Sequence, residues 1–376
     1  MEFGIFNGVY TPRSMVEAEG RDAEHRRFRE EVAWVKAADR SGFKYVWATE
    51  HHFLEEYSHL SANESFLGYC AAATERIHLG SGIFNVTPPV NHPARIAERA
   101  ATLDHLSEGR FEMGMGRGSS TTEQRGFGID DPELTREMFD EAVPEIVKMW
   151  HDGEYPGFDG RFFSMPPRNV LPKPYTVPHP PLWVAAGSPS TFEKAARMGL
   201  GVLCFTTGPV ESLAPLIERY KRAVVDAEPV GDYVNDNVMV TSSMLCLEDP
   251  RRARDLMLRA RGGYHRSLLF RYLDTFPRPD GIPEWPELVP ETTPEEIDAA
   301  IDLREWPIGD PDTVSEAVQR WVDVGADQLV FGMLSQELPI DVVLEATELF
   351  GREVIPRFDT EPQHRTTRLR LAQVGV

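Results

Sequence analysis

Cysteine is scarce in this sequence, which has three among 376 residues: Cys70, Cys204 and Cys246. They lie far apart and in apolar surroundings, such as the run Val-Leu-Cys-Phe that contains Cys204. This distribution argues against a disulfide framework, and the paired spacing of a zinc ribbon is missing as well. We interpret all three cysteines as core residues.

Long apolar runs and positive charge are also in short supply. No apolar stretch approaches the ~18 residues that a membrane-spanning helix needs. The sequence starts at Met1 without a basic or apolar leader, so we expect a cytoplasmic protein. Lys and Arg number 39 against 60 Asp and Glu, a formal net charge of −21, which would repel nucleic acid and anionic membrane surfaces. An enzyme with a small-molecule substrate fits this charge better.

Eight short β-rich segments alternate with amphipathic helical stretches, which is typical of βα units around a parallel sheet. The predicted strands are residues 2–6, 45–49, 77–84, 111–115, 182–186, 202–205, 238–247 and 328–333. The predicted helices are residues 25–41, 63–74, 94–106, 136–150, 191–198, 211–226, 250–261, 312–324 and 340–354. No Gly-rich dinucleotide fingerprint follows the first strand, so a doubly wound sheet is disfavoured. We predict one α/β domain over residues 1–359, a (β/α)8 TIM barrel.

Three segments depart from this alternation. Residues 153–181 are rich in Pro, Gly and aromatic residues and indicate an irregular excursion with a small hairpin. Residues 262–309 form an insertion between the seventh and eighth units, which would overhang the active-site face as a lid or be a disordered insertion. Residues 360–376 carry no core pattern and are expected to be a loose C-terminal tail.

The block Glu50-His51-His52-Phe53 falls where the second predicted strand ends. Catalytic groups of barrels collect at the C-terminal ends of the strands. Successive side chains of a strand point to opposite faces, so the two histidines are poorly placed to hold one metal ion. We interpret the block as an acid/base site in which one histidine is positioned by the other and by a carboxylate. The alternative is a pair of histidines with a purely structural role.

Two further strand ends are suited to an anion. After the strand that starts at Phe111, Arg117 stands in a Gly-rich turn where its guanidinium and backbone N–H groups can contact phosphate. After the strand that contains Trp183, Gly187, Ser188 and Thr191 stand at a helix start, where free N–H groups favour phosphate. A surface ion pair and ordinary N-caps are the alternatives. Together the two sites favour a phosphorylated cofactor.

With these residues in view, the sequence resembles the bacterial luciferase-like flavin monooxygenase family over nearly its whole length. The most specific block is Leu-Asp-x-Leu-Ser-x-Gly-Arg, which ends at Arg110. The blocks that carry the resemblance are residues 47–53, 91–98, 102–110, 114–118, 184–191, 309–314 and 325–329.

The resemblance implies a (β/α)8 barrel that binds reduced FMN at the strand C-terminal ends and activates O₂ as a C4a-peroxyflavin. The product would be an oxygenated small organic molecule, and an apolar substrate is expected. A separate NAD(P)H:flavin reductase would supply FMNH₂, and family members generally pair as homodimers.

Site residues follow from the resemblance by matched position. His51 resembles the catalytic histidine next to the flavin, and His52 its neighbour, hydrogen-bonded to Glu98. Gly82-Ile83 matches the non-prolyl cis peptide behind the flavin ring. The phosphate clamp would consist of Arg117, Arg136, Ser188 and Thr191, with Gly187 beside them. No metal ligand is implied.

The sequence also departs from luciferase. Gly187 replaces its phosphate-binding glutamate and Gly116 its reactive cysteine, which argues against light emission and leaves the oxygenation chemistry open. Two alternatives therefore stand: hydride transfer with coenzyme F420 on the same fold, and a non-catalytic flavin-binding subunit. Aromatic residues expected to line the pocket, unless they are ordinary barrel core, are Phe6, Trp47, Phe53, Phe84 and Phe205.

Overall fold

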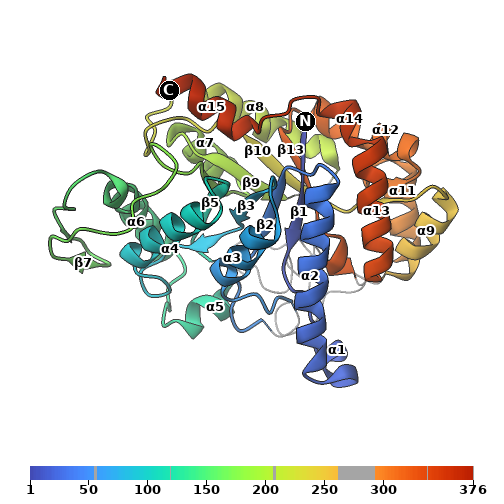
Figure 1. Ribbon diagram of the computed structural model, residues 1–376, viewed down its shortest axis with the longest axis horizontal. Coiled ribbons are helices and arrows are strands. Elements are labelled where there is room, and N and C mark those ends of the chain that lie inside the picture. The colour runs from blue at the N-terminus through green and yellow to red at the C-terminus, as the bar shows by residue number, and fades with distance from the viewer. Residues whose placement is uncertain (55–56, 119, 206–208, 261–292, 337, 376) are drawn as a thin grey trace.

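A closed barrel of parallel strands forms the centre of the molecule (Figure 1). The computed structural model describes residues 1–54, 57–118, 120–205, 209–260, 293–336 and 338–375. Each barrel strand pairs with the next in parallel, and the pairing of β1 with β13 closes the ring. The barrel strands are β1 (Glu2–Asn7), β2 (Tyr45–Ala48), β3 (His78–Ser81), β5 (Phe111–Gly116), β8 (Leu182–Ala185), β9 (Gly201–Phe205), β10 (Val238–Ser242) and β13 (Gln328–Phe331). The predicted (β/α)8 TIM barrel is confirmed.

Helices surround the barrel, and several of them begin at a residue whose side chain caps the helix. Asp310 caps α12, since its Oδ1 accepts a hydrogen bond of 2.8 Å from the backbone N–H of Thr313, and Pro311 takes the first helical position. None of the helices in the described ranges is long and apolar enough to cross a membrane. The helices are α1 (Arg13–Glu19), α2 (Asp22–Arg40), α3 (Asn63–Ala73), α4 (Pro93–Leu106), α5 (Thr121–Gly126), α6 (Leu134–Trp150), α7 (Pro189–Arg197), α8 (Ala214–Ala223), α9 (Pro250–Arg259), α11 (Pro294–Asp302), α12 (Pro311–Asp323), α13 (Ile340–Glu353), α14 (Ile355–Phe358) and α15 (Arg365–Val374).

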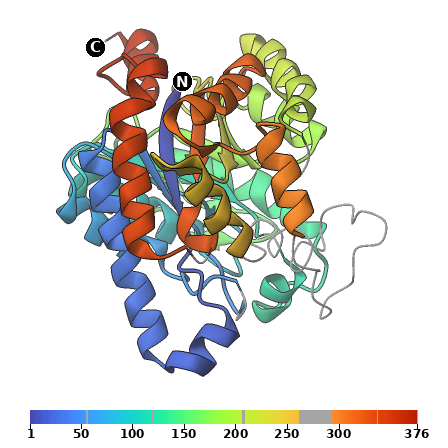
Figure 2. The same cartoon turned by 90° about the vertical axis from the view of Figure 1, so that its right-hand side faces the viewer.

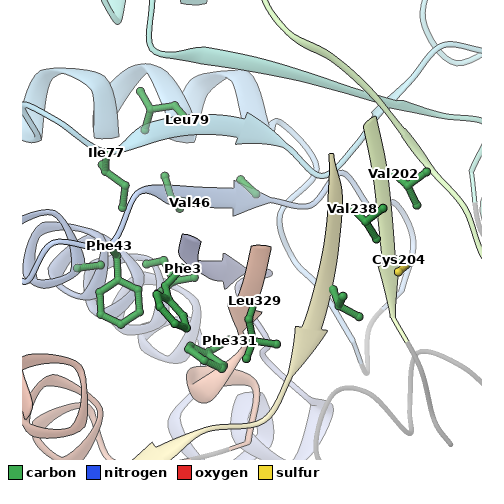
Figure 3. Close-up of a cluster of buried hydrophobic side chains, with 14 of the residues drawn as sticks. Phe3, Phe43, Val46, Ile77, Leu79, Val202, Cys204, Val238, Leu329 and Phe331 are labelled. Carbon is green, nitrogen blue, oxygen red and sulfur yellow. The ribbon is translucent and has the colours of Figure 1, made fainter. Parts of the chain in front are cut away.

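The period of two along each strand divides the core into two parts. On β2, Val46 belongs to the large cluster between barrel and helices, whereas Tyr45 and Trp47 belong to a smaller cluster inside the barrel. Figure 3 shows part of the outer cluster, which also contains Cys204. All three cysteines are buried and unpaired, as expected of core residues.

Helices α2 and α13 illustrate how the outer layer is fixed. They run side by side along one flank of the barrel (Figures 1 and 2). The indole N–H of Trp34 on α2 donates a 3.0 Å hydrogen bond to Oγ1 of Thr347 on α13. Because both side chains are buried, this bond satisfies polar atoms that would otherwise be costly to remove from water.

The third predicted strand is interrupted. Strand β3 ends at Ser81, the peptide bond between Gly82 and Ile83 is cis as expected, and β4 (Phe84–Asn85) then resumes pairing with β5. The buried Asn63 bridges this interruption, because its Nδ2 donates to the carbonyl oxygens of Ala48 at 3.1 Å and Ile83 at 3.2 Å.

The two predicted interruptions of the barrel have different outcomes. Residues 153–181 contain the expected hairpin, formed by the antiparallel strands β6 (Phe158–Asp159) and β7 (Ser164–Met165). Of the 262–309 insertion, the expected lid over residues 262–292 lies outside the described residues. Its described end contains α11 and β12 (Ile308–Gly309), which pairs with β11 (Leu245–Cys246). The seventh predicted strand, residues 238–247, is thus divided between β10 and β11.

The prediction of a loose C-terminal tail is wrong. Residues 365–374 form α15, which lies at the end of the barrel where the N-terminus also lies (Figure 1). Oγ1 of the buried Thr366 donates to Oε1 of Glu112 at 2.6 Å, and the ring of His364 stacks on that of His78 at 3.6 Å. At this end the barrel interior contains the polar side chains of Glu112 and His78, and the C-terminal segment contacts both of them.

Candidate functional site

Both histidines of the predicted block lie just beyond β2, at the C-terminal end of the barrel strands. Nδ1 of His51 lies 3.0 Å from Oε1 of Glu123, and the backbone N–H of His52 donates to the same oxygen at 2.9 Å. Glu123 belongs to α5 and is buried. Glu123 was not among the site residues predicted from the sequence. Its signal was a helix start, because Ser120 three residues earlier caps α5 through a hydrogen bond with the backbone N–H of Glu123.

The carboxylate of Glu123 is held in its ionised form. Burial by itself would raise the pKa of this carboxyl. The neighbouring His51 and the hydrogen bonds from His51, the His52 N–H and the Ser120 hydroxyl outweigh burial and lower the pKa below its ordinary value. Oγ of Ser120 donates to Oε2 at 2.9 Å. An anion is therefore fixed beside the imidazole of His51.

His52 has a different carboxylate partner from the one expected. Its Nε2 lies 3.2 Å from Oε1 of Glu50. The predicted hydrogen bond between His52 and Glu98 is wrong, because the carboxylate of Glu98 pairs instead with the exposed Arg95 at 2.6 Å. Glu50 is two residues from His52, and the backbone turn after β2 brings both side chains together. Among the predicted catalytic residues, His51 and His52 lie together beyond β2, whereas Glu98 is paired with Arg95.

The first predicted anion site lies at the end of β5. Nη1 of Arg117 donates to Oγ1 of Thr135 at 2.7 Å. The pKa of Arg117 is lowered, first by burial and then by the positive charge of Arg136. Arg136 is exposed and pairs with Glu133 at 3.3 Å.

The second predicted anion site lies at the end of β8, next to β5 in the barrel. Ser188 is the N-cap of α7, and its Oγ lies 2.8 Å from Oγ1 of Thr191 and 3.1 Å from Oγ of Ser190. Gly187 precedes the cap and is exposed. The capping role is thus present, because the N–H of Thr191 donates to Oγ of Ser188 at 3.4 Å, and what this strand end offers an anion is chiefly its hydroxyl groups.

The expected pocket aromatics divide between three places. Phe6 and Trp47 contribute to the cluster inside the barrel. Phe53 is 58% exposed and its ring lies 5.1 Å from that of Phe127. For Phe84 the alternative of ordinary core is confirmed, because its side chain packs in the outer cluster between barrel and helices. The side chain of Phe205 lies outside the described residues.

Within the ranges that the structure describes, no group of three or more His, Cys, Asp and Glu side chains is arranged to hold a metal ion.

Comparison with known families then identifies the class of the protein. Residues 1–328 match the family model of luciferase-like monooxygenases. The chain belongs to the luciferase-like monooxygenase family.

Two curated relatives of this family member differ in their cofactors. The oxygenase component of a flavin-dependent trigonelline monooxygenase from Acinetobacter baylyi is 30% identical over 189 residues, 50% of this chain and 51% of that protein. An F420-dependent glucose-6-phosphate dehydrogenase from Beutenbergia cavernae is 29% identical over 342 residues, 89% of this chain and 95% of that protein. Sequence similarity alone therefore places the protein among oxidoreductases without choosing the cofactor.

Solved structures agree with the fold. Monooxygenase RslO1 from Streptomyces bottropensis superposes with a TM-score of 0.77 at 25% identity, covering 96% of this chain and 100% of that chain. The oxygenating constituent of 3,6-diketocamphane monooxygenase from Pseudomonas putida, in complex with FMN, superposes with a TM-score of 0.76 at 19% identity, with the same two coverages.

Proposed function

We propose that this luciferase-like protein is the oxygenase component of a two-component monooxygenase. It would take reduced FMN from a separate NAD(P)H:flavin reductase and use O₂ to insert one oxygen atom into a small, apolar organic substrate. The observation that carries the proposal is the His51–Glu123 pair, an imidazole held by a buried anion at the barrel end where the anion-suited strand ends also lie.

The residues present fit a phosphorylated flavin. Arg117 and Arg136 bring two positive charges together, and a phosphate dianion would relieve their repulsion through charge-assisted hydrogen bonds. Ser188 and Thr191 offer hydroxyls at the N-terminus of α7, on the neighbouring strand end. When bound, reduced FMN supplies the electrons with which O₂ is activated.

His51 would hold or move a proton at Nε2. Because Glu123 is ionised, Nδ1 of His51 carries the hydrogen that faces the carboxylate. Nε2 is then the atom left for cofactor or substrate, because among the described residues the hydrogen bond of the His51 ring is made by Nδ1. The T-shaped packing of His51 on Tyr57, with ring centroids 4.8 Å apart, fixes the plane of the imidazole.

The runner-up is hydride transfer with F420, which is favoured by the dehydrogenase relative that matches 89% of this chain. The same cationic strand ends would accept the phosphodiester of that cofactor. The two functions differ in the fate of O₂, since only a monooxygenase places an oxygen atom from O₂ in its product.

The deciding experiment is an anaerobic titration of the purified protein with reduced FMN and with reduced F420, followed by ¹⁸O₂ and a library of apolar aldehydes, ketones and aromatic compounds. We expect tighter binding of reduced FMN and one ¹⁸O atom in a product. Binding of F420 with substrate reduction would replace the proposal with the runner-up. Binding of either cofactor without consumption would support a non-catalytic flavin-binding subunit.

We also propose a homodimer. Tyr69 on α3 and Leu106 on α4 expose 55% and 60% of their area, and a second copy would remove such apolar surface from water. Light scattering should give twice the chain mass of 42.4 kDa. A mass equal to one chain would contradict the dimer.

A further inference from the structure

A line of polar contacts leads from the outside of the barrel to His52, and it begins at Arg99 on α4. Nη1 of Arg99 donates to Oε1 of Glu64 on α3 at 2.8 Å, and Nη2 donates to Oδ1 of Asn91 at 2.6 Å. The guanidinium carbon also lies 5.4 Å from the centre of the Phe84 ring. Helices α3 and α4 are neighbours (Figure 1), so this cation is held between them.

Arg99 determines which way the Asn91 amide faces. An amide has one acceptor and one donor end, and a guanidinium can only donate. Since Oδ1 of Asn91 accepts from Arg99, its Nδ2 must point to the other side. There it donates to Oε1 of Glu50 and to the backbone carbonyl of Asn85, both at 2.9 Å.

Glu50 is the buried centre of the network. Its Oε1 receives the Asn91 amide and lies 3.2 Å from Nε2 of His52, and its Oε2 accepts from the backbone N–H of Asn85 at 3.1 Å. A buried carboxylate needs such donors, since water cannot solvate it. The position of the Asn91 amide therefore decides where the carboxylate lies, and the carboxylate decides where the ring of His52 lies.

We propose that Arg99 is a positioning residue for His52, acting through Asn91 and Glu50 without touching the site. This proposal rests on the proposed function, in which His51 and His52 belong to the site where protons are transferred during turnover. The network takes the place of the His52–Glu98 pair that the family resemblance implies. Without the cation, the Asn91 amide is free to turn, Glu50 loses a donor, and the imidazole of His52 loses its fixed partner.

Matched variants separate this role from a general tie between helices. Arg95→Ala removes another arginine of α4, which pairs with Glu98 and is 67% exposed. Glu64→Gln weakens the contact between α3 and α4 and leaves the Arg99–Asn91 bond in place. Asn91→Asp keeps the bond to Arg99 but turns a carboxylate oxygen, instead of an N–H, toward Glu50.

The first measurement is the ¹H–¹⁵N NMR signal of the Nε2–H group of His52 in the flavin-free protein. We expect a slowly exchanging signal in the wild type, Arg95→Ala and Glu64→Gln, and its loss in Arg99→Ala and Asn91→Asp. Arg99→Lys should restore it in part, because a lysine can reach one of the two acceptors. Retention of the signal in both Arg99→Ala and Asn91→Asp would overturn the proposal.

The second measurement is turnover with reduced FMN. Arg99→Ala should lower kcat on the order of tenfold, as the loss of an outer-shell hydrogen-bonding partner commonly does, with KM for the flavin unchanged. Equal kcat in Arg99→Ala and Arg95→Ala would contradict the positioning role. If the wild type shows no oxygenation while the NMR signal still depends on Arg99, the proposed function fails and the network stands. If Arg99→Ala does not fold, the NMR signal of His52 and kcat are measured in Asn91→Asp and Arg99→Lys instead.

Discussion

Oε1 of Glu123 lies 3.0 Å from Nδ1 of His51, although the two residues are 72 positions apart in the chain. The same oxygen accepts the backbone N–H of His52. One buried carboxylate thus sets both the ring orientation of His51 and the course of the backbone beside it. This relationship gives the proposed site its most direct test.

Glu123→Gln keeps the shape of the side chain and removes its charge. We expect turnover to fall about 10–100-fold, because an outer-shell carboxylate orients the imidazole and fixes its tautomer. The rate of product formation from a single addition of reduced FMN measures this. Glu98→Gln is the control and should change the rate less than about twofold, since Glu98 pairs with the exposed Arg95 and not with a histidine. An equal loss in both variants would restore Glu98 to the site.

Arg117→Ala should weaken FMN binding about 10–100-fold, the usual range for a hydrogen bond to a charged group. Its guanidinium lies at the strand end suited to phosphate and is partly buried. Titration followed by flavin fluorescence gives the affinity. Riboflavin, which lacks the phosphate, should bind the variant and the wild type equally. A matching loss of riboflavin affinity would mean that Arg117 supports the fold of the pocket instead.

The C-terminal helix should make stability depend on pH through His364. Burial first, and then the stacked His78, lower the pKa of His364 to about 2. The folded protein therefore keeps this ring neutral, whereas the unfolded chain takes up a proton below about pH 6.5. The contribution of His364 to the free energy of unfolding is fully present above that pH and is lost progressively as the pH falls.

His364→Gln removes this titration. Between pH 7.5 and 5.5 the wild type should lose about 1 kcal/mol more stability than the variant, because only the unfolded wild type can bind the additional proton on His364. Urea unfolding at the two pH values measures both free energies. Parallel pH dependence of the two proteins would show that His364 is solvated or protonated in the folded state.

The three cysteines should be inert to thiol reagents in the folded protein. Burial raises the pKa of the Cys204 and Cys246 thiols to about 12 and that of Cys70 further still, so the reactive thiolate is nearly absent at neutral pH. A chromogenic disulfide reagent should detect no thiol in native protein and three in denaturant. Fast reaction of one native thiol would place that residue at an accessible surface.

Much of the barrel is determined by local sequence pattern. The alternation at Tyr45, Val46 and Trp47 already assigns each side chain to the inside or outside of the barrel, and Asp310-Pro311 marks a helix start by its own chemistry. Such signals lie within a few residues of each other. They can therefore be interpreted without knowledge of the rest of the fold. They also placed the histidine block at the C-terminal end of the strands, where the structure has it.

Partners across the fold were decided only in three dimensions. The family resemblance implied Glu98 as the partner of His52, but the structure pairs His52 with Glu50 and His51 with the unexpected Glu123. The structure also shows that the segment expected to be a loose tail forms α15, whose Thr366 donates a hydrogen bond to the buried carboxylate of Glu112. Periodicity reports which face of an element is buried, whereas a hydrogen bond depends on where two distant backbones come within about 3 Å. The sequence by itself determined the barrel and placed the histidine block at the C-terminal end of β2, and the tertiary structure decided which carboxylates hold the two histidines.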